Sequence, residues 1–340
     1  PRPDGLLCSF QLGHKSHSDQ KINQKDLSIY SRAIDMTTGF IGFSIPKQER
    51  VSTIILDQKT VREFCTQVND ISIQEIEYKP FLRFKIANIL DNLTKGTLST
   101  YLQSILTDRS GGAIVVDSFK HYFKENQYMD HKIFGVLLST AISHLIGLPN
   151  LDSMSGKFYA RFTVNHTDES DSYLRQAYRR LELHTDGTFV DEKTDWVLMQ
   201  KLESLNCVGG DSLLLHIDEW EDFDKFYRHP LAKENIQWGS PPSKNVSEKV
   251  YHPVFFEGGK WNLPCMSFID QFAEPQNMKQ GLYLNAISES LEKDTNIVAV
   301  EIPVNGILII NNSFWLHGRD EIKPNVNLSR ELLRQRGVFV

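Results

Sequence analysis

The feature that most constrains the fold is a change of pattern after Asn150, where short apolar or alternating runs replace longer helical ones. Turn-forming pairs separate these runs, among them Gly209-Gly210 and Asn311-Asn312. Short strands divided by such turns are typical of antiparallel sandwiches and jelly rolls, whereas parallel units need a helix between strands. We therefore predict a jelly roll with strands over residues 158–164, 194–202, 212–216, 298–304, 307–310 and 337–340.

The first 150 residues have a helix-rich pattern instead. Five apolar residues recur with helical spacing in the stretch 60–93: Leu82, Ile86, Ile89, Leu90 and Leu93. A buried helix is expected over 132–148, ended by Gly147 and Pro149, and it is too short to span a membrane. Two further helices are expected near 218–227 and 282–292. The expected class is α+β or mainly β: residues 1–50 form a poorly defined lead-in, and residues 51–340 form one jelly-roll domain that includes the helical part at about 60–150.

Composition narrows the range of partners and cofactors. The formal net charge of −6 and the isoelectric point near 6.0 argue against a nucleic-acid partner, which usually requires a basic surface. The four cysteines are far apart and form no CxxC pair, so a cysteine-based zinc or iron–sulfur site is not expected. No secretion signal opens the sequence, and we therefore expect a cytoplasmic protein without a membrane partner.

A candidate metal site begins with His184 and Asp186. Side chains two residues apart point to the same side of a strand, so these two could share one metal ion, which a helix would prevent. His317, at the end of a distant apolar run, is the candidate third ligand. Two histidines and one carboxylate form the facial triad of non-haem Fe(II) oxygenases, which leaves positions open for substrate and oxygen. Without His317, a surface turn with a paired histidine would be the favoured explanation of the His184–Asp186 pair, and His317 brings the metal site level with it.

A basic segment follows His317. If residues 329–337 form a strand, Arg330, Arg334 and Arg336 share one face, and they repel one another unless anions lie between them. The guanidinium group is well suited to binding carboxylates. A solvated basic edge strand is the alternative, but together with the triad this pattern favours a site for two carboxylate-bearing molecules. Ser212, after the Gly209-Gly210 turn, adds a hydroxyl group at the start of a strand, although a plain hairpin would also explain it.

Taken together, these motifs resemble the Fe(II)/2-oxoglutarate dioxygenases of the taurine-dioxygenase and clavaminate-synthase group. The sequence is more similar still to one family, the CsiD family of glutarate 2-hydroxylases, from about Thr60 to the C-terminus. The resemblance is carried by residues 172–176, 184–188, 209–212, 241–247, 252–255 and 314–320.

The resemblance implies a double-stranded β-helix with flanking helices, in which His184, Asp186 and His317 hold Fe(II). It implies that 2-oxoglutarate and O2 are co-substrates, with Arg330 anchoring the far carboxylate of 2-oxoglutarate and Ser212 supporting it. Arg334 and Arg336 would remain for the second dicarboxylate, glutarate, which would become L-2-hydroxyglutarate with release of succinate and CO2. It also implies a cytoplasmic homotetramer that acts in lysine degradation.

Two alternatives remain at this stage. One is a hydroxylase of another small anionic acid, and the other is a non-catalytic jelly roll that senses a dicarboxylate. The assignment of each arginine to one ligand is also open, because all three are expected to face one pocket.

Overall fold

The computed structural model describes residues 38–45, 48–118, 129–152, 155–165, 178–240, 248–259 and 262–340. The expected lead-in up to residue 37 lies outside the described residues, as do the family-like segments 172–176 and 241–247.

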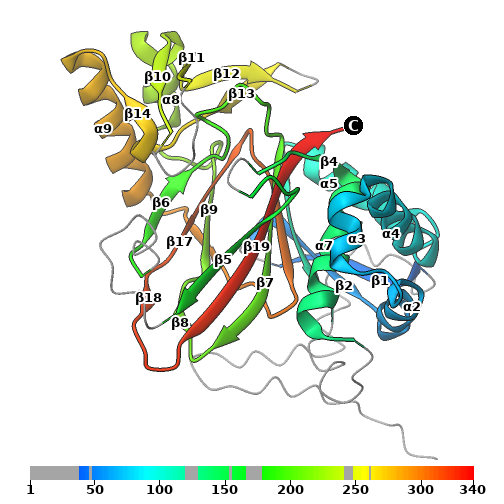
Figure 1. Cartoon of the computed structure of the whole chain (residues 1–340). Helices are drawn as coiled ribbons and strands as arrows, with labels where there is room; N and C mark the ends of the chain where they lie inside the picture. Colours follow the sequence, from blue (N-terminus) through cyan, green and yellow to red (C-terminus); the bar gives the residue numbers. More distant parts are fainter. Residues whose placement is uncertain are drawn as a thin grey trace, which may run out of the picture.

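Two facing antiparallel sheets form the centre of the molecule (Figure 1). Eight strands build them, in chain order β5 (Ala160–Asn165), β6 (Leu181–His184), β7 (Trp196–Leu205), β9 (Ser212–His216), β15 (Val298–Val300), β16 (Ile307–Asn311), β17 (Trp315–Arg319) and β19 (Ser329–Phe339). The larger sheet contains four of these strands in the order β16-β7-β19-β5. The smaller sheet contains the other four in the order β15-β9-β17-β6. Strands that follow one another in the chain lie in opposite sheets, except for β9 and β15, which pair within the smaller sheet. This is the topology of a double-stranded β-helix, so the predicted jelly roll is confirmed.

The larger sheet continues beyond the jelly roll. Three strands from the first part of the chain extend it past β16: β3 (Ala113–Asp117), β2 (Gln48–Leu56) and β1 (Phe40–Ile45). A short strand, β4 (Gly147–Pro149), pairs with the end of β19. The sequence pattern did not predict β1, β2 or β3. Residues 1–50 were predicted to be a poorly defined lead-in, but they include β1 and the first residues of β2.

Five helices cover the outer face of the larger sheet (Figure 1). They are α2 (Gln58–Val68), α3 (Ile73–Tyr78), α4 (Pro80–Leu93), α5 (Thr97–Thr107) and α7 (His131–Ile146). The helical stretch expected over 60–93 is divided into three helices. The division has local causes: Ser72 and Glu75 form a capping box at the start of α3, and Pro80 occupies the first turn of α4, where its missing N–H group is not needed.

The larger sheet is buried on both faces, and this creates two apolar cores. In β16, Leu308 and Ile310 pack between the two sheets, while Ile307 and Ile309 pack against the helices. Such a strand has apolar residues at every position, which explains why it appears in the sequence as a continuous apolar run.

The remaining described elements include α8 (Phe223–Tyr227), α9 (Met278–Lys293) and small sheets that lie on the side of the smaller sheet (Figure 1). These sheets pair β10 (Ile236–Trp238) with β11 (Val250–His252) and β14 (Ala273–Glu274), β12 (Phe255–Gly258) with β13 (Leu263–Met266), and β8 (Val208–Gly209) with β18 (Ile322–Lys323). No helix in the described ranges is both long and apolar enough to cross a membrane.

Candidate metal centre

The three predicted ligands come from two neighbouring strands of the smaller sheet. His184 ends β6, His317 lies in β17, and the two are direct partners in the antiparallel register. Asp186 lies two residues beyond β6, at the start of the segment that leads to β7. Direct cross-strand partners carry neighbouring side chains on the same face. This register therefore brings together two histidines that are far apart in the sequence.

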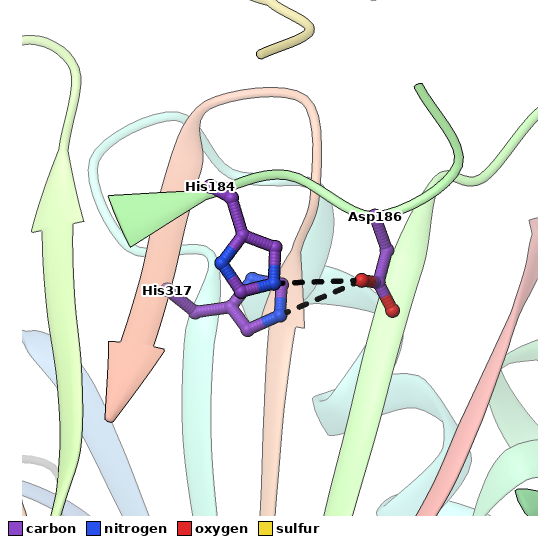
Figure 2. Close-up of side chains that lie close together, drawn as sticks. All are labelled: His184, Asp186 and His317. Atoms are coloured by element: carbon purple, nitrogen blue, oxygen red, sulfur yellow. Dashed lines mark ion pairs between the residues drawn. The ribbon is translucent and has the colours of Figure 1, made fainter. Parts of the chain in front are cut away.

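Figure 2 shows the three side chains converging. Asp186 Oδ1 lies 3.7 Å from His184 Nε2 and 3.8 Å from His317 Nε2. One donor atom from each residue lies within 4.8 Å of the others, and no other group of this kind occurs in the described part of the chain. All three side chains are at least nine-tenths buried. This arrangement leaves one shared position that all three donor atoms face.

Hydrogen bonding prepares His184 for metal binding. Its Nδ1–H group donates to the carbonyl oxygen of Glu182 at 2.8 Å, which leaves the lone pair of Nε2 free on the side of Asp186. A backbone carbonyl on the far nitrogen is the usual way to fix the ring and the tautomer of a metal-binding histidine.

Electrostatics keep the other two ligands in the protonation states that a metal requires. Burial, followed by the neighbouring His184, lowers the pKa of His317 to about 3, so the ring is neutral at physiological pH. Burial alone would raise the pKa of Asp186, but Arg334 and the two histidines lower it below its ordinary value. Neutral imidazoles and an ionised carboxylate are the forms that bind divalent metals. The donor set therefore fits an Fe(II) ion with three protein ligands.

Asn312, in the turn between β16 and β17, fixes the segment that carries Asp186. Its Oδ1 accepts a hydrogen bond from the Asp186 N–H group, and its Nδ2 donates to the carbonyl oxygens of Asp186 and Thr194, each at 2.9 Å. Gly187, next to Asp186, adopts a left-handed φ of +84°, which favours glycine. A β-carbon there would also lie only 2.5 Å from Thr194 Oγ1, so this close approach requires glycine. In the sequence, Asn312 appears only as part of a turn, because a local pattern cannot show a contact with residue 186.

The three arginines project from one face of β19, as the strand interpretation predicted. Val197 and Met199, the cross-strand partners of Arg336 and Arg334, belong to the core between the two sheets, so this face points into the jelly roll. Arg334 Nη1 lies 3.2 Å from Asp186 Oδ2, which places this guanidinium beside the metal ligands. The charge of Arg336 also acts on Asp186.

Arg330 lies near the start of β19, at a different part of the interior. Its Nη2 donates to the carbonyl oxygen of Gly210 at 2.9 Å, and the residue is buried. Ser212, two residues after Gly210, is buried at the start of β9. The structure thus places Arg330 near the Gly209–Ser212 segment and Arg334 and Arg336 near Asp186. Another cation on this side, Lys201 of β7, is also buried and was not predicted from the sequence.

Comparisons with known proteins agree with this fold. A family model described as CsiD matches residues 43–339, so the match begins earlier than residue 60. A curated glutarate 2-hydroxylase from Citrobacter koseri is 44% identical over 315 residues, which cover 92% of this chain and 95% of the relative. The solved structure of asparagine oxygenase with Fe(II), 2S,3S-3-hydroxyasparagine and succinate aligns with a TM-score of 0.68 at 16% identity, covering 84% of this chain and 93% of that one. The non-heme iron oxygenase OrfP with Fe and alpha-ketoglutaric acid aligns with a TM-score of 0.62 at 14% identity, covering 84% and 94%. At these identities, the two structures support the jelly-roll fold alone.

Proposed function

Because the chain belongs to the CsiD family, we propose that it is an Fe(II)- and 2-oxoglutarate-dependent dioxygenase that hydroxylates glutarate to L-2-hydroxyglutarate. Succinate and CO2 are the products of the co-substrate. The observation that carries this proposal is the buried convergence of His184, Asp186 and His317 beside a strand with inward-facing arginines. A pure dicarboxylate sensor has no need of a buried three-ligand metal site.

The proposed roles of the residues follow from their positions. His184, Asp186 and His317 hold the iron on one side, which leaves its other positions for 2-oxoglutarate and O2. The iron and O2 supply the oxidising chemistry, and the protein orients the two acids and keeps bulk water out.

We assign the carboxylate anchors by their place along β19. Arg330 with Ser212 binds the far carboxylate of 2-oxoglutarate, and Arg334 and Arg336 bind glutarate. Arg330 and Arg334 are four residues apart, about 13 Å along a strand, which supports separate ligands for their side chains. Separate guanidinium forks keep two similar dicarboxylates in their own places.

We also propose the wider setting. The partner is a small dicarboxylate, without a nucleic-acid or membrane partner, and the protein acts as a cytoplasmic homotetramer in lysine degradation. The net charge of −6 and the family resemblance support these points. Residues 51–340 are proposed to work as one domain, and β1 and the first residues of β2, which precede residue 51, add strands to its larger sheet.

The test is a single-turnover experiment. The protein is loaded anaerobically with Fe(II) and 2-oxoglutarate, with or without glutarate, and is then exposed to oxygen. We expect succinate and 2-hydroxyglutarate in equal amounts when glutarate is present, and slower succinate formation without it. Succinate formation stimulated by another small acid, but not by glutarate, would leave the oxygenase assignment intact and overturn the substrate. No succinate under any condition would favour a binding protein.

A further inference from the structure

Lys201 is a buried cation whose side chain points between the two sheets. The flanking residues on β7 face the opposite way: a β-carbon on Gly135 of α7 would lie 2.5 Å from Leu202 Cδ2 and 3.3 Å from Gln200 Nε2. Successive side chains alternate across a strand, so Lys201 projects away from α7 and into the jelly roll. Only 9% of its surface is exposed.

The register places Lys201 next to Arg330. Lys201 is the cross-strand partner of Leu332, which lies two residues from Arg330 on the same face of β19. The register shifts by a bulge between Glu331 and Leu332, and the charge of Arg330 acts on Lys201 across it, so the two cations lie near each other. Ser212 completes this end of the interior, because alternation along β9 puts it on the same face as Leu214, the direct partner of His317.

Within the described ranges neither Lys201 nor Arg330 forms an ion pair, and Asp211 acts on both only through its charge at a distance. Among the described residues, the Lys201 ammonium makes no hydrogen bond and no ion pair. Burial, followed by the charge of Arg330, lowers the pKa of Lys201, while Glu301 and Asp211 act in the opposite direction. Arg330 itself donates to a neutral carbonyl oxygen. Burying a charge without a partner is costly, so two adjacent buried cations indicate an anion that binds between them.

We propose that Lys201 is a second cationic ligand of the far carboxylate of 2-oxoglutarate, which it binds together with Arg330. This inference rests on the proposed function and adds a residue to its co-substrate site. A carboxylate offers about four lone-pair sites on its two oxygens, enough for a guanidinium, an ammonium and the Ser212 hydroxyl. A 2-oxo acid that lacks this carboxylate would leave both cations unpaired, so the pair makes the site selective for dicarboxylates.

The experiment measures binding rather than turnover. Lys201→Met keeps most of the length of the side chain and removes its charge. Lys323→Met is the control, because it removes a charge from an exposed position on β18, which pairs with β8 just before Gly210. Calorimetric titrations use Mn(II)-loaded protein with two ligands: 2-oxoglutarate, and oxalate, which chelates the metal but has no far carboxylate. For Lys201→Met we expect the Kd of 2-oxoglutarate to rise about tenfold or more and the Kd of oxalate to stay within about twofold. For Lys323→Met we expect neither to change.

Thermal unfolding separates this result from simple damage to the fold. Removing an unpaired buried charge should leave the metal-free, ligand-free protein at least as stable, while the rise in Tm caused by 2-oxoglutarate with Mn(II) becomes smaller. An unchanged Kd for 2-oxoglutarate, or an equal loss for oxalate, would overturn the role of Lys201. A loss of affinity confined to glutarate, titrated in the same way, would overturn this role and place Lys201 in the substrate site. Unmutated protein that does not bind 2-oxoglutarate at all would contradict the proposed function, and this inference with it.

Discussion

At the scale of single residues, the site depends on three side chains that have no substitutes nearby. His184, Asp186 and His317 face one position, and no other three-residue group of this kind occurs in the described ranges. Each side chain would therefore supply one of only three protein bonds to the metal. The loss of any one leaves a pair that cannot hold the ion on a single face.

The first prediction follows from this dependence. His184→Ala, Asp186→Ala and His317→Ala should each abolish succinate formation and lower bound iron by about tenfold or more, while the circular dichroism spectrum stays unchanged. His144→Phe is the control, because His144 is a largely buried histidine that packs between Phe84 and Phe158 in another part of the molecule. A ligand variant that retains normal turnover would remove that residue from the triad.

The second prediction concerns Arg330→Lys. Lysine keeps the charge but loses the planar fork, so the Kd of 2-oxoglutarate should rise about tenfold or more, equivalent to about 1.4 kcal/mol per decade. The measurement is an anaerobic titration, with glutarate titrated in parallel. A change in glutarate affinity alone would reverse the assignment of the arginines.

At the scale of elements, β19 supplies the third prediction. If Arg334 and Arg336 hold glutarate, Arg334→Ala and Arg336→Ala should misplace its reacting carbon, and a shift of about 1 Å can cost on the order of 100-fold in rate. Decarboxylation of 2-oxoglutarate does not depend on the glutarate contacts and should be reduced less. Arg336→Ala is the cleaner variant, because Arg334→Ala also removes the ion pair with the metal ligand Asp186. The ratio of 2-hydroxyglutarate to succinate should therefore fall below one, measured for both products in the same sample. Equal loss of both products would place these arginines in the co-substrate site or in the fold.

The fourth prediction concerns the turn between β16 and β17. Asn312→Ala removes three hydrogen bonds from the segment that carries Asp186, so metal affinity should fall by about 10- to 100-fold. Asn311→Ala is a matched control one residue away, because the Asn311 side chain bonds to Leu106 and Ser313 instead. Both variants should lose about 1–3 kcal/mol of unfolding free energy. If both lost metal affinity equally, Asn312 would have no specific role in holding Asp186.

Sequence patterns predicted those elements whose signal is local. The parity of Arg330, Arg334 and Arg336 depends only on the period of a strand, and the structure shows it. His184 and Asp186 also meet, but Asp186 lies in a turn beyond β6, where Asn312 holds its backbone. Asn312 and Lys201 were missed because their roles depend on contacts with residues that are distant in the sequence. The early strands β1, β2 and β3 were also missed, since β2 and β3 pair in parallel across intervening helices and no turn signal marks that pairing.

At the scale of the whole molecule, buried histidines couple stability to pH. Burial lowers the pKa of His144 to about 4 and that of His216 to about 3, against an ordinary value of 6.5. Between the folded and ordinary values, the unfolded chain binds more protons than the folded protein, so stability rises with pH in this window. Acidification from pH 6.5 toward 4 should therefore destabilise the protein.

The fifth prediction concerns how steeply the free energy of unfolding falls with pH. Each such histidine should contribute up to about 1.4 kcal/mol per pH unit in its window. Urea unfolding of the metal-free protein between pH 7.5 and 4.5 should show the decline, and His144→Phe should make it shallower. An identical slope in the variant would show that His144 does not carry this proton linkage.

The two faces of β19 have separate roles, one in the binding site and one in the packing of the fold. The inner face carries the arginines, while on the outer face Leu333 packs in the core beneath the helices and Glu331 forms ion pairs with Arg161 and Lys132. Substitutions on one face leave the contacts of the other untouched. A combinatorial library limited to the inward positions can therefore be screened for new acid substrates while the outer face keeps its packing. Natural relatives can change their substrate specificity by the same route.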